Sequence, residues 1–349
     1  MEVQMKKTGG WLLRLLGIGV AIALLCLTVY YTGARPIQAL RGADPLLLFM
    51  AFGCIGITHL LGGYRLGRLL AVHGVHLNFF LLFRLTLIGA FFSQIIPGAV
   101  SGDLVKLAIV VRRYPGRGAA AVMSGMIDRV IGVSGLFLVA SLCGGIFWLM
   151  NPAIVAGEPV VRTALLAVFM GGVASLCGLG VMVYHSHIIK IGWIHCVVTW
   201  LGRHSPCVVV GFVERLCASA DAYRHHKKVL LEVIAISMII HFLLGVGVFC
   251  TGRALGEDKG SFGVYLISMQ VGNAVTLIPV TPGGLGMRES MTATMFMALG
   301  NGNENDGFAG SVPVVNALCN IAWALIGAIA LGTLPRHPPE GCSALSDGI

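Results

Sequence analysis

Eight stretches of 18 or more residues contain no Asp, Glu, Lys or Arg, and together they cover more than half of the 349-residue chain. They are Leu15–Ala34, Pro45–Tyr64, Leu85–Gly102, Val130–Gly157, Thr163–Ile189, Val233–Gly252, Gly260–Met287 and Gly307–Pro335. A helix needs about 20 apolar residues to cross a bilayer core about 30 Å thick. The chain is only 11% charged, which excludes a soluble enzyme, a nucleic-acid-binding domain and a disordered chain as descriptions of the whole. The stretches predict an all-α polytopic membrane protein.

The basic residues between the stretches predict how the chain crosses the membrane, because Lys and Arg concentrate on the cytoplasmic side. If all eight stretches cross, the two sides receive 10 and 14 of the 24 basic residues, which is a weak bias. If the third and seventh stretches enter and return on the same side, one side receives 18 and the other 6. The second arrangement gives about six full crossings, two re-entrant segments and both termini in the cytoplasm. The net charge of +9 is then a topology signal.

The third and seventh stretches are also the ones that proline and glycine interrupt. Glycines follow the prolines Pro97 and Pro282, at Gly98 and Gly102 in the third stretch and at Gly283, Gly284 and Gly286 in the seventh. Proline removes a backbone donor, and glycine tolerates conformations that other residues avoid. Freed backbone groups at membrane depth must be satisfied by protein or by water in a cavity. We therefore predict two broken helices that line a polar space.

The two broken segments resemble each other, because an acidic and a basic residue follow each Pro-Gly break. Asp103 and Lys106 follow the first break, and Arg288 and Glu289 follow the second. Interrupted segments in corresponding halves, with opposite orientation, mark the substrate site of inverted-repeat transporters. The alternative is two helix-breaking loops that share common loop residues. The topology requires both breaks, which favours an inverted repeat.

Three segments carry a resemblance to a known family: Phe91–Lys106 with its Pro-Gly break, Asp128–Gly132, and Thr281–Glu289. In this order and spacing they are similar to the integral-membrane, flippase-like domain of the lysylphosphatidylglycerol synthases and its stand-alone relatives. The family often has Gly-Gly where Ala99 and Ser101 stand here, so the first motif is weaker than usual.

The resemblance covers almost the entire chain, roughly Leu12 to Leu334. It implies a flippase-like membrane domain over residues 1–334, followed by a short polar cytoplasmic tail at 335–349. In the full synthases a large soluble lysyl-transferase domain performs the chemistry. Nothing in this sequence resembles that domain, so we expect the lipid-translocating part without the enzyme.

Two charged pairs in the first half are the strongest candidates for contact with a headgroup. Asp103 and Lys106 lie three residues apart and could share one helix face, where Lys106 would attract a lipid phosphate. Asp128 and Arg129 are flanked by apolar residues, and ionisable groups inside a membrane helix usually face the protein interior or a water-filled cavity. The guanidinium of Arg129 also matches phosphate with two donors. The alternatives are headgroup-solvated residues, a structural ion pair or an interfacial Arg.

The second break completes the candidate set. The predicted substrate-binding residues are Pro97, Gly98, Gly102, Asp103, Lys106, Asp128, Arg129, Pro282, Gly283, Gly284, Gly286, Arg288 and Glu289. Further polar residues near the breaks, Ser93, Gln94, Asn273 and Thr276, either bind a headgroup or satisfy freed backbone groups. Arg84 more simply extends to the cytoplasmic interface.

The sequence gives little indication of metal, cofactor or catalytic chemistry. The segment from His185 to His226 is rich in His and Cys, but its spacings match no compact zinc pattern and it has no Cys-x-x-Cys. It is also basic, which favours amphipathic helices on an anionic membrane surface. No hydrolase, zincin or P-loop motif is found. We expect no metal, no cofactor and no enzymatic activity.

The predicted function is to move a lipid, or the headgroup of a lipid-linked precursor, between leaflets of a bacterial inner membrane. The expected substrates are anionic phospholipids and polyprenyl phosphates. We expect no binding to nucleic acid. One alternative is a transporter of a small soluble anion. Another is an accessory subunit of a separately encoded lipid-modifying enzyme, or a membrane-embedded transferase.

Overall fold

In a computed structural model of the chain, every regular element among the described residues is a helix. The described residues are 34–96, 101–188, 226–257, 260–299 and 307–333, with 19, 22, 23, 25–30 and 223. The helices are α2 (Pro36–Arg41), α3 (Pro45–Val72), α4 (Phe79–Ile95), α5 (Ser101–Arg113), η1 (Pro115–Arg117), α6 (Gly118–Met150), α7 (Pro152–Gly157), α8 (Pro159–Ile188), α11 (Lys227–Ala254), α12 (Phe262–Val275), α13 (Met287–Ala298) and α14 (Phe308–Gly332). The chain is thus an all-α polytopic membrane protein.

Helix lengths separate crossing helices from re-entrant ones. Five helices, α3, α6, α8, α11 and α14, are long and apolar enough to cross a membrane. By contrast, α4 has 17 residues and α12 has 14. At 1.5 Å per residue they are about 25 and 21 Å long, shorter than a bilayer core of about 30 Å. These are the helices of the third and seventh stretches. Most of the first stretch, Leu15–Ala34, lies outside the described residues.

Local signals set where these helices begin. Asp44 precedes α3 and accepts the backbone N–H of Leu46 at 2.8 Å, and Pro45 occupies the first helical position. Asn78 caps α4 in the same way, accepting the N–H of Phe80 at 3.0 Å. These caps fix the boundary between polar loop and apolar helix.

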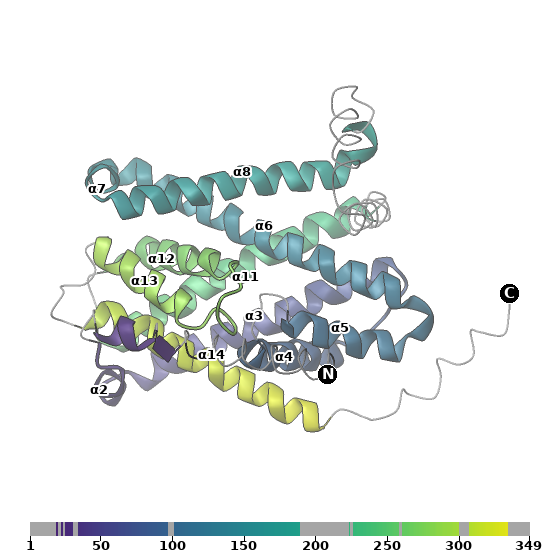
Figure 1. Ribbon diagram of the computed structural model, residues 1–349, viewed down its shortest axis with the longest axis horizontal. Helices are drawn as coiled ribbons and strands as arrows, with labels where there is room; N and C mark the ends of the chain where they lie inside the picture. The colour runs from purple at the N-terminus through teal and green to yellow at the C-terminus, as the bar shows by residue number, and fades with distance from the viewer. Residues whose placement is uncertain are drawn as a thin grey trace, which may run out of the picture.

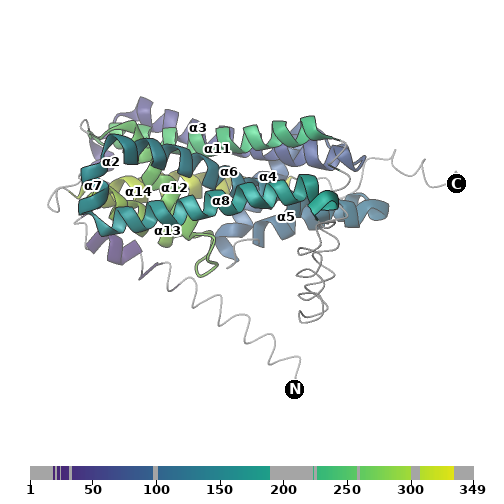
Figure 2. The same cartoon turned by 90° about the horizontal axis from the view of Figure 1, so that it is seen from above.

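The long helices lie roughly parallel to one another, as Figures 1 and 2 show. The short helices α2 and α7 both lie at the left end of the bundle in Figure 1, far from each other, and the turn η1 between α5 and α6 lies at the opposite end. Residues at each end also bond across helices: Arg117 donates to the carbonyl of His73 at 2.9 Å at one end, and Asp44 donates its N–H to the carbonyl of Ala254 at 2.9 Å at the other. The described loops therefore divide between the two ends as the basic-residue count predicts.

The two broken segments form helical hairpins that enter from opposite ends of the bundle. Figure 1 shows α12 and α13 at the end near α2 and α7, and α4 and α5 toward the opposite end. The packing repeats between halves: α3 packs on α4 as α11 packs on α12, α4 packs on α14 as α12 packs on α6, and α5 packs on α6 as α13 packs on α14. Both α3 and α11 are 28 residues long and pack against each other. This exchange of partners is the arrangement expected of an inverted repeat.

The glycines of the second break are required by its backbone conformation. Gly283, Gly284 and Gly286 have φ values of 59°, 72° and 82°, in the region that favours glycine. The turn touches the other hairpin, because a Cβ placed on Gly283 would lie 2.8 Å from Oε1 of Gln94 on α4. Gln94 lies close to the first break, whose residues 97–100 are outside the described part of the chain. The turn of the second hairpin thus meets the inner end of α4.

The first hairpin is held by direct backbone contact between its two helices. A Cβ added to Gly102 on α5 would lie 2.0 Å from the carbonyl oxygen of Gly89 on α4 and 2.2 Å from the hydroxyl of Ser93. Only glycine leaves room for this approach. Ser101, beside it, donates to the carbonyl of Ile96 at 2.8 Å, which satisfies a backbone group next to the break.

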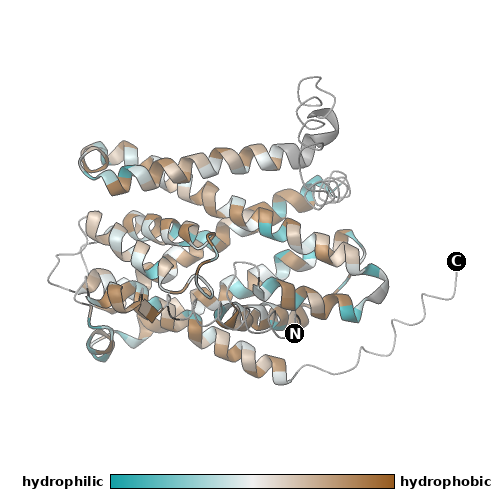
Figure 3. Ribbon diagram, viewed as in Figure 1, coloured by the Kyte–Doolittle hydropathy of each residue, from teal (hydrophilic) through white to brown (hydrophobic). Residues whose placement is uncertain are grey.

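Hydrophobic residues are spread along the length of the long helices (Figure 3), and many of them are exposed. Large side chains such as Phe49, Leu149, Met170, Leu231 and Ile329 are more than two-thirds exposed. The charged residues described below are instead buried or face an internal cavity. This inside-out distribution fits a protein whose solvent is lipid.

Candidate functional site

A polar cavity of about 340 Å³ lies between the two repeats. Helices α3, α4, α5, α6, α11 and the end of α12 contribute to its wall. Its polar lining residues are Thr58, His59, Arg65, Thr86, Asp103, Lys106, Asp128, Arg129, His241, Asn273 and Thr276. His59 and His241 lie at the middle of 28-residue spans, so the cavity is at mid-depth in the bundle.

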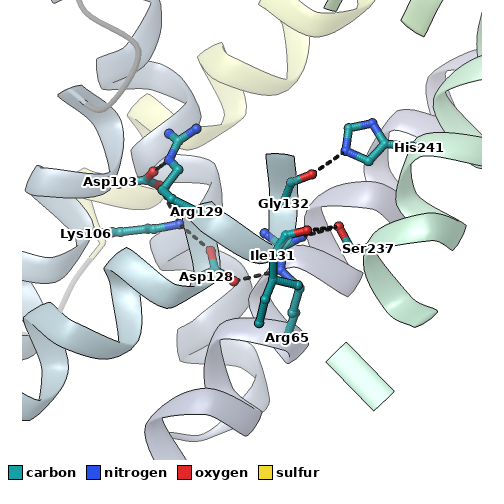
Figure 4. A network of polar contacts seen from close by, with 9 residues as sticks. All are labelled: Arg65, Asp103, Lys106, Asp128, Arg129, Ile131, Gly132, Ser237 and His241. Carbon is teal, nitrogen blue, oxygen red and sulfur yellow. Dashed lines mark hydrogen bonds and ion pairs between the residues drawn. The ribbon is translucent and has the colours of Figure 1, made fainter. Parts of the chain in front are cut away.

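The charges of the first half meet in this cavity as one network (Figure 4). Lys106 and Asp103 on α5 form an ion pair at 2.6 Å between Nζ and Oδ1, as their spacing of three residues allows. Asp103 also pairs with Arg129 on α6. Lys106 lies 3.9 Å from Oδ2 of Asp128, whose Oδ1 accepts from Nε of Arg65 on α3 at 2.7 Å. Three helices thus supply the network.

Within this network one cation is more accessible than the others. The side chains of Arg65 and Lys106 are 11% and 9% exposed, and those of Asp103 and Asp128 are 11% and 4% exposed. The side chain of Arg129 is 43% exposed. Figure 4 draws its guanidinium at the edge of the network, with only Nε directed at Asp103. Its remaining donors are therefore available to a ligand in the cavity.

The charged residues that line the cavity do not balance. Arg65, Lys106 and Arg129 supply three positive charges, and Asp103 and Asp128 supply two negative charges. The formal excess is one positive charge at mid-depth in the bundle, where an uncompensated charge is costly. An anion bound beside Arg129 would compensate it, and a phosphate group offers the two acceptors that a guanidinium fork matches.

His241 on α11 also lines the cavity, and each of its two ring nitrogens lies within hydrogen-bond distance of a partner. Its Nε2 lies 3.1 Å from the carbonyl oxygen of Gly132 on α6, and its Nδ1 lies 3.1 Å from Oε1 of Gln270 on α12. The amide nitrogen of Gln270 donates to the backbone carbonyl of His241 at 2.7 Å. Gln270 itself is fully buried.

An apolar groove of about 620 Å³ adjoins the polar cavity. Its lining is Phe137, Pro159, Val160, Thr163, Ala164, Ala167, Val168, Val271, Ala274, Val275, Ile278 and Met291. The two spaces are lined by neighbouring residues of the same helices: Leu136 lines the cavity and Phe137 the groove on α6, and Asn273 lines the cavity and Ala274 the groove on α12. A polar pocket and an apolar groove therefore lie on different faces of α6 and α12.

The structure separates the predicted site residues into two groups. Asp103, Lys106, Asp128 and Arg129 meet at the cavity, whereas Arg288 and Glu289 are not in its lining. Glu289 is buried and accepts the N–H of Gly286 at 2.6 Å and Nε of Arg288 at 2.9 Å. This pair therefore closes the turn of the second hairpin. Of the first break, Pro97 and Gly98 lie outside the described residues.

The structure also shows where the further polar residues near the two breaks lie. Asn273 and Thr276 line the cavity, and Gln94 contacts the second break. Arg84 donates to the carbonyl of Ala330 at 3.3 Å and to the hydroxyl of Thr333 at 2.7 Å, which joins α4 to the end of α14.

The His- and Cys-rich segment falls almost wholly outside the described residues. Elsewhere in the described chain, no group of three or more His, Cys, Asp or Glu side chains could hold a metal ion.

Sequence reasoning missed Arg65, His59 and His241. Arg65 ends the second uncharged stretch, so it reads as an interfacial residue, yet it reaches Asp128 inside the bundle. The positions of the two histidines could have identified them, because each is the fifteenth residue of a 28-residue helix. They are therefore equivalent residues of the two repeats, which becomes apparent only when the repeats are aligned with each other.

Comparison with known proteins places these features in a wider group. A family model described as "Lysylphosphatidylglycerol synthase TM region" matches residues 14–312. Among curated proteins, the chain is similar to the "Glycosyltransferase AglD" of Haloferax volcanii, with 25% identity over 300 residues. That alignment covers 79% of this chain and 47% of the relative, so the chain spans about half of the relative's length. No solved structure matches the chain.

Proposed function

Because the chain belongs to the family of lysylphosphatidylglycerol synthase transmembrane regions, we propose that it moves the headgroup of an anionic lipid between the two leaflets of the membrane. The observation that carries the proposal is the cavity at mid-depth with three basic and two acidic side chains in its wall. A lipid phosphate supplies the missing negative charge and accepts hydrogen bonds from Arg129.

The adjoining apolar groove favours a lipid over a small soluble anion. A soluble anion needs only the polar cavity. An amphiphile needs a polar space for its headgroup and a continuous apolar surface for its chain, and burial of each CH₂ group contributes about 0.8 kcal/mol. In this proposal the phosphate lies beside Arg129, and the first part of one hydrocarbon chain lies along Ala274 and Phe137 in the groove.

The two hairpins support a mechanism of alternating access. In this proposal α4–α5 and α12–α13 form the gates toward the two sides, and they meet where Gln94 touches Gly283. Movement of either hairpin relative to the long helices would open the cavity to one leaflet at a time. The end of the bundle that carries η1 faces the cytoplasm of a bacterial inner membrane, with both termini on that side, in accordance with the excess of basic residues there.

The test is a leaflet-accessibility assay on the full chain in proteoliposomes. Fluorescent phospholipids with anionic, zwitterionic and cationic headgroups are compared for wild type, Arg129→Ala and Pro282→Ala. We expect the anionic probe to move fastest and Arg129→Ala to abolish its movement. A polyprenyl phosphate is the second anionic probe, because one relative is named a glycosyltransferase.

Two other outcomes would each replace the proposal. Uptake of radiolabelled phosphate without movement of any lipid would establish a small-anion transporter. Activity that appears only with a separately encoded lipid-modifying enzyme would establish an accessory subunit. Movement of all three headgroups at equal rates would show that the charge of the cavity does not select the substrate.

A further inference from the structure

The hydrogen bonds of His241 form a chain that ends on an acceptor at both sides. At one end, the carbonyl oxygen of Gly132 contacts Nε2 of His241. In the middle, Nδ1 of His241 contacts Oε1 of Gln270. At the other end, the amide nitrogen of Gln270 contacts the backbone carbonyl of His241. A carbonyl can only accept, so both ends of the chain require a donor.

A neutral imidazole cannot satisfy this chain. It offers one donor and one acceptor, and an amide also offers a donor on one side and an acceptor on the other. Two such groups in series between two acceptors leave one contact in which two acceptors face each other. Turning the Gln270 amide over only moves the mismatch from Nδ1 to the backbone carbonyl of His241. An additional proton at Nδ1 makes all three contacts favourable.

We propose that His241 is a proton-binding site and that its proton is bound together with the anionic ligand of the cavity. A hydronium ion in the cavity transfers a proton to the lone pair of Nδ1, which forms an N–H bond directed at Oε1 of Gln270 and leaves a water molecule. The coupling rests on the proposed function, because it needs an anion in the same cavity.

The charges around His241 explain why the proton and the anion bind together. Helix α3 contributes Arg65 and His59 to the cavity, α6 contributes Asp128 and Arg129, and α5 contributes Asp103 and Lys106. Neither α12 nor α14 contributes a titratable side chain to the described lining. Without a ligand the wall already has one excess positive charge, which disfavours an imidazolium. A bound phosphodiester neutralises that excess, so each ligand raises the affinity for the other by the same factor.

The chain offers a matched control for this inference. His59 occupies the equivalent position in the first repeat and lines the same cavity. Its ring contacts that of Trp323 at 6.1 Å between centroids, and it makes no hydrogen bond to a described residue. The acceptor chain therefore exists at His241 and not at His59, so His59→Gln removes a cavity imidazole without removing the proposed proton site.

The proton site is tested by nuclear magnetic resonance on the full chain with ¹⁵N-labelled histidine. The protein is placed in nanodiscs of phosphatidylcholine alone, or of equal parts phosphatidylcholine and phosphatidylglycerol, and titrated between about pH 5 and 8. His241→Gln assigns the signal. We expect a ring with two N–H groups at low pH, and a titration midpoint that moves to higher pH in the anionic nanodiscs, by about 5- to 150-fold in proton affinity.

Two variants show whether the hydrogen-bond chain is responsible. Gln270→Leu removes the acceptor at Nδ1, so we expect proton binding to weaken and the response to phosphatidylglycerol to shrink. His59→Gln alters the cavity wall but not the hydrogen-bond chain, so in that variant the His241 ring should still take up a second proton. In transport assays the rate for fluorescent phosphatidylglycerol should fall as pH rises through the midpoint in wild type and in His59→Gln, and should not vary with pH in His241→Gln.

The outcomes separate this inference from the proposed function. If phosphatidylglycerol is moved in an Arg129-dependent manner but the His241 midpoint is the same in both nanodiscs, the coupling is wrong and the proposed function stands. If a single N–H persists on the His241 ring throughout the titration, the proton site itself is wrong. If no lipid is moved, the proposed function fails, and the ring in phosphatidylcholine alone still decides whether the proton site exists.

Discussion

Arg65 on α3 donates a hydrogen bond from Nε to Oδ1 of Asp128 on α6 at 2.7 Å, in the interior of the bundle. The same guanidinium donates from Nη1 to the hydroxyl of Ser237 on α11 at 3.1 Å, and that hydroxyl donates to the carbonyl of Ile131 at 3.0 Å. One side chain thus joins three crossing helices and forms part of the cavity wall.

Breaking this pair from one side should destabilise the fold. Arg65→Ala leaves the Asp128 carboxylate buried with only Lys106 nearby, and removal of one partner of a buried ion pair typically costs about 3–5 kcal/mol. We expect a lower thermal unfolding midpoint in nanodiscs. The double variant Arg65→Met with Asp128→Leu should recover most of the stability but not transport. A single variant as stable as wild type would show that the pair contributes nothing to the fold.

Arg129→Ala should behave in the opposite way. Its side chain is 43% exposed and faces the cavity, so its removal costs little packing. We expect loss of anionic lipid movement, with expression and the unfolding midpoint close to those of wild type. Arg162→Ala, on a loop-proximal and exposed position of α8, is the control that should keep full transport. Normal transport by a well-folded Arg129→Ala would contradict the proposed role.

Gly284→Ala should disturb the second hairpin. The residue has a φ of 72°, and an added Cβ would lie 2.4 Å from the side chain of Thr276. Residues other than glycine in this region typically cost about 1–3 kcal/mol. We expect reduced thermal stability and slower transport. Gly178→Ala on α8 is the matched control, since nothing lies within 4 Å of its added Cβ and alanine favours a helix by about 1 kcal/mol.

A bulky residue in the apolar groove should separate headgroup binding from chain binding. Ala274→Trp places an indole where the hydrocarbon chain is proposed to lie. We expect transport of long-chain phosphatidylglycerol to fall by at least about tenfold, a loss of about 1.4 kcal/mol, while a short-chain probe is less affected. Val173→Trp, on the lipid-facing side of α8, should have no effect. Equal loss for both probes would indicate that the groove holds no chain.

Much of the fold follows from the distribution of charge along the sequence. The uncharged stretches predict the five long helices, because lipid excludes charge, and the Pro-Gly breaks predict the two hairpins, because proline removes a backbone donor and glycine permits a sharp turn. The division of loops between the two ends follows from the same residues. These are properties that a short segment determines by itself.

The site was only half predictable for a physical reason. The sequence identifies four of the site residues, because a charged side chain beside or within an apolar stretch needs a partner. These residues are Asp103, Lys106, Asp128 and Arg129. Arg288 and Glu289 satisfy the same rule but find their partners in the turn of their own hairpin. Arg65 and the Gln270–His241 contact depend on which helices become neighbours, and nothing local in the sequence encodes that.

The contact between Gly89 and Gly102 also has a mechanical consequence. With a carbonyl oxygen against an α-carbon, the main chains of α4 and α5 are in direct contact at this point. The contact holds Asp103 and Lys106, on α5, at a defined place relative to α4. The hairpin movement proposed above would therefore carry this pair of charges together with α4.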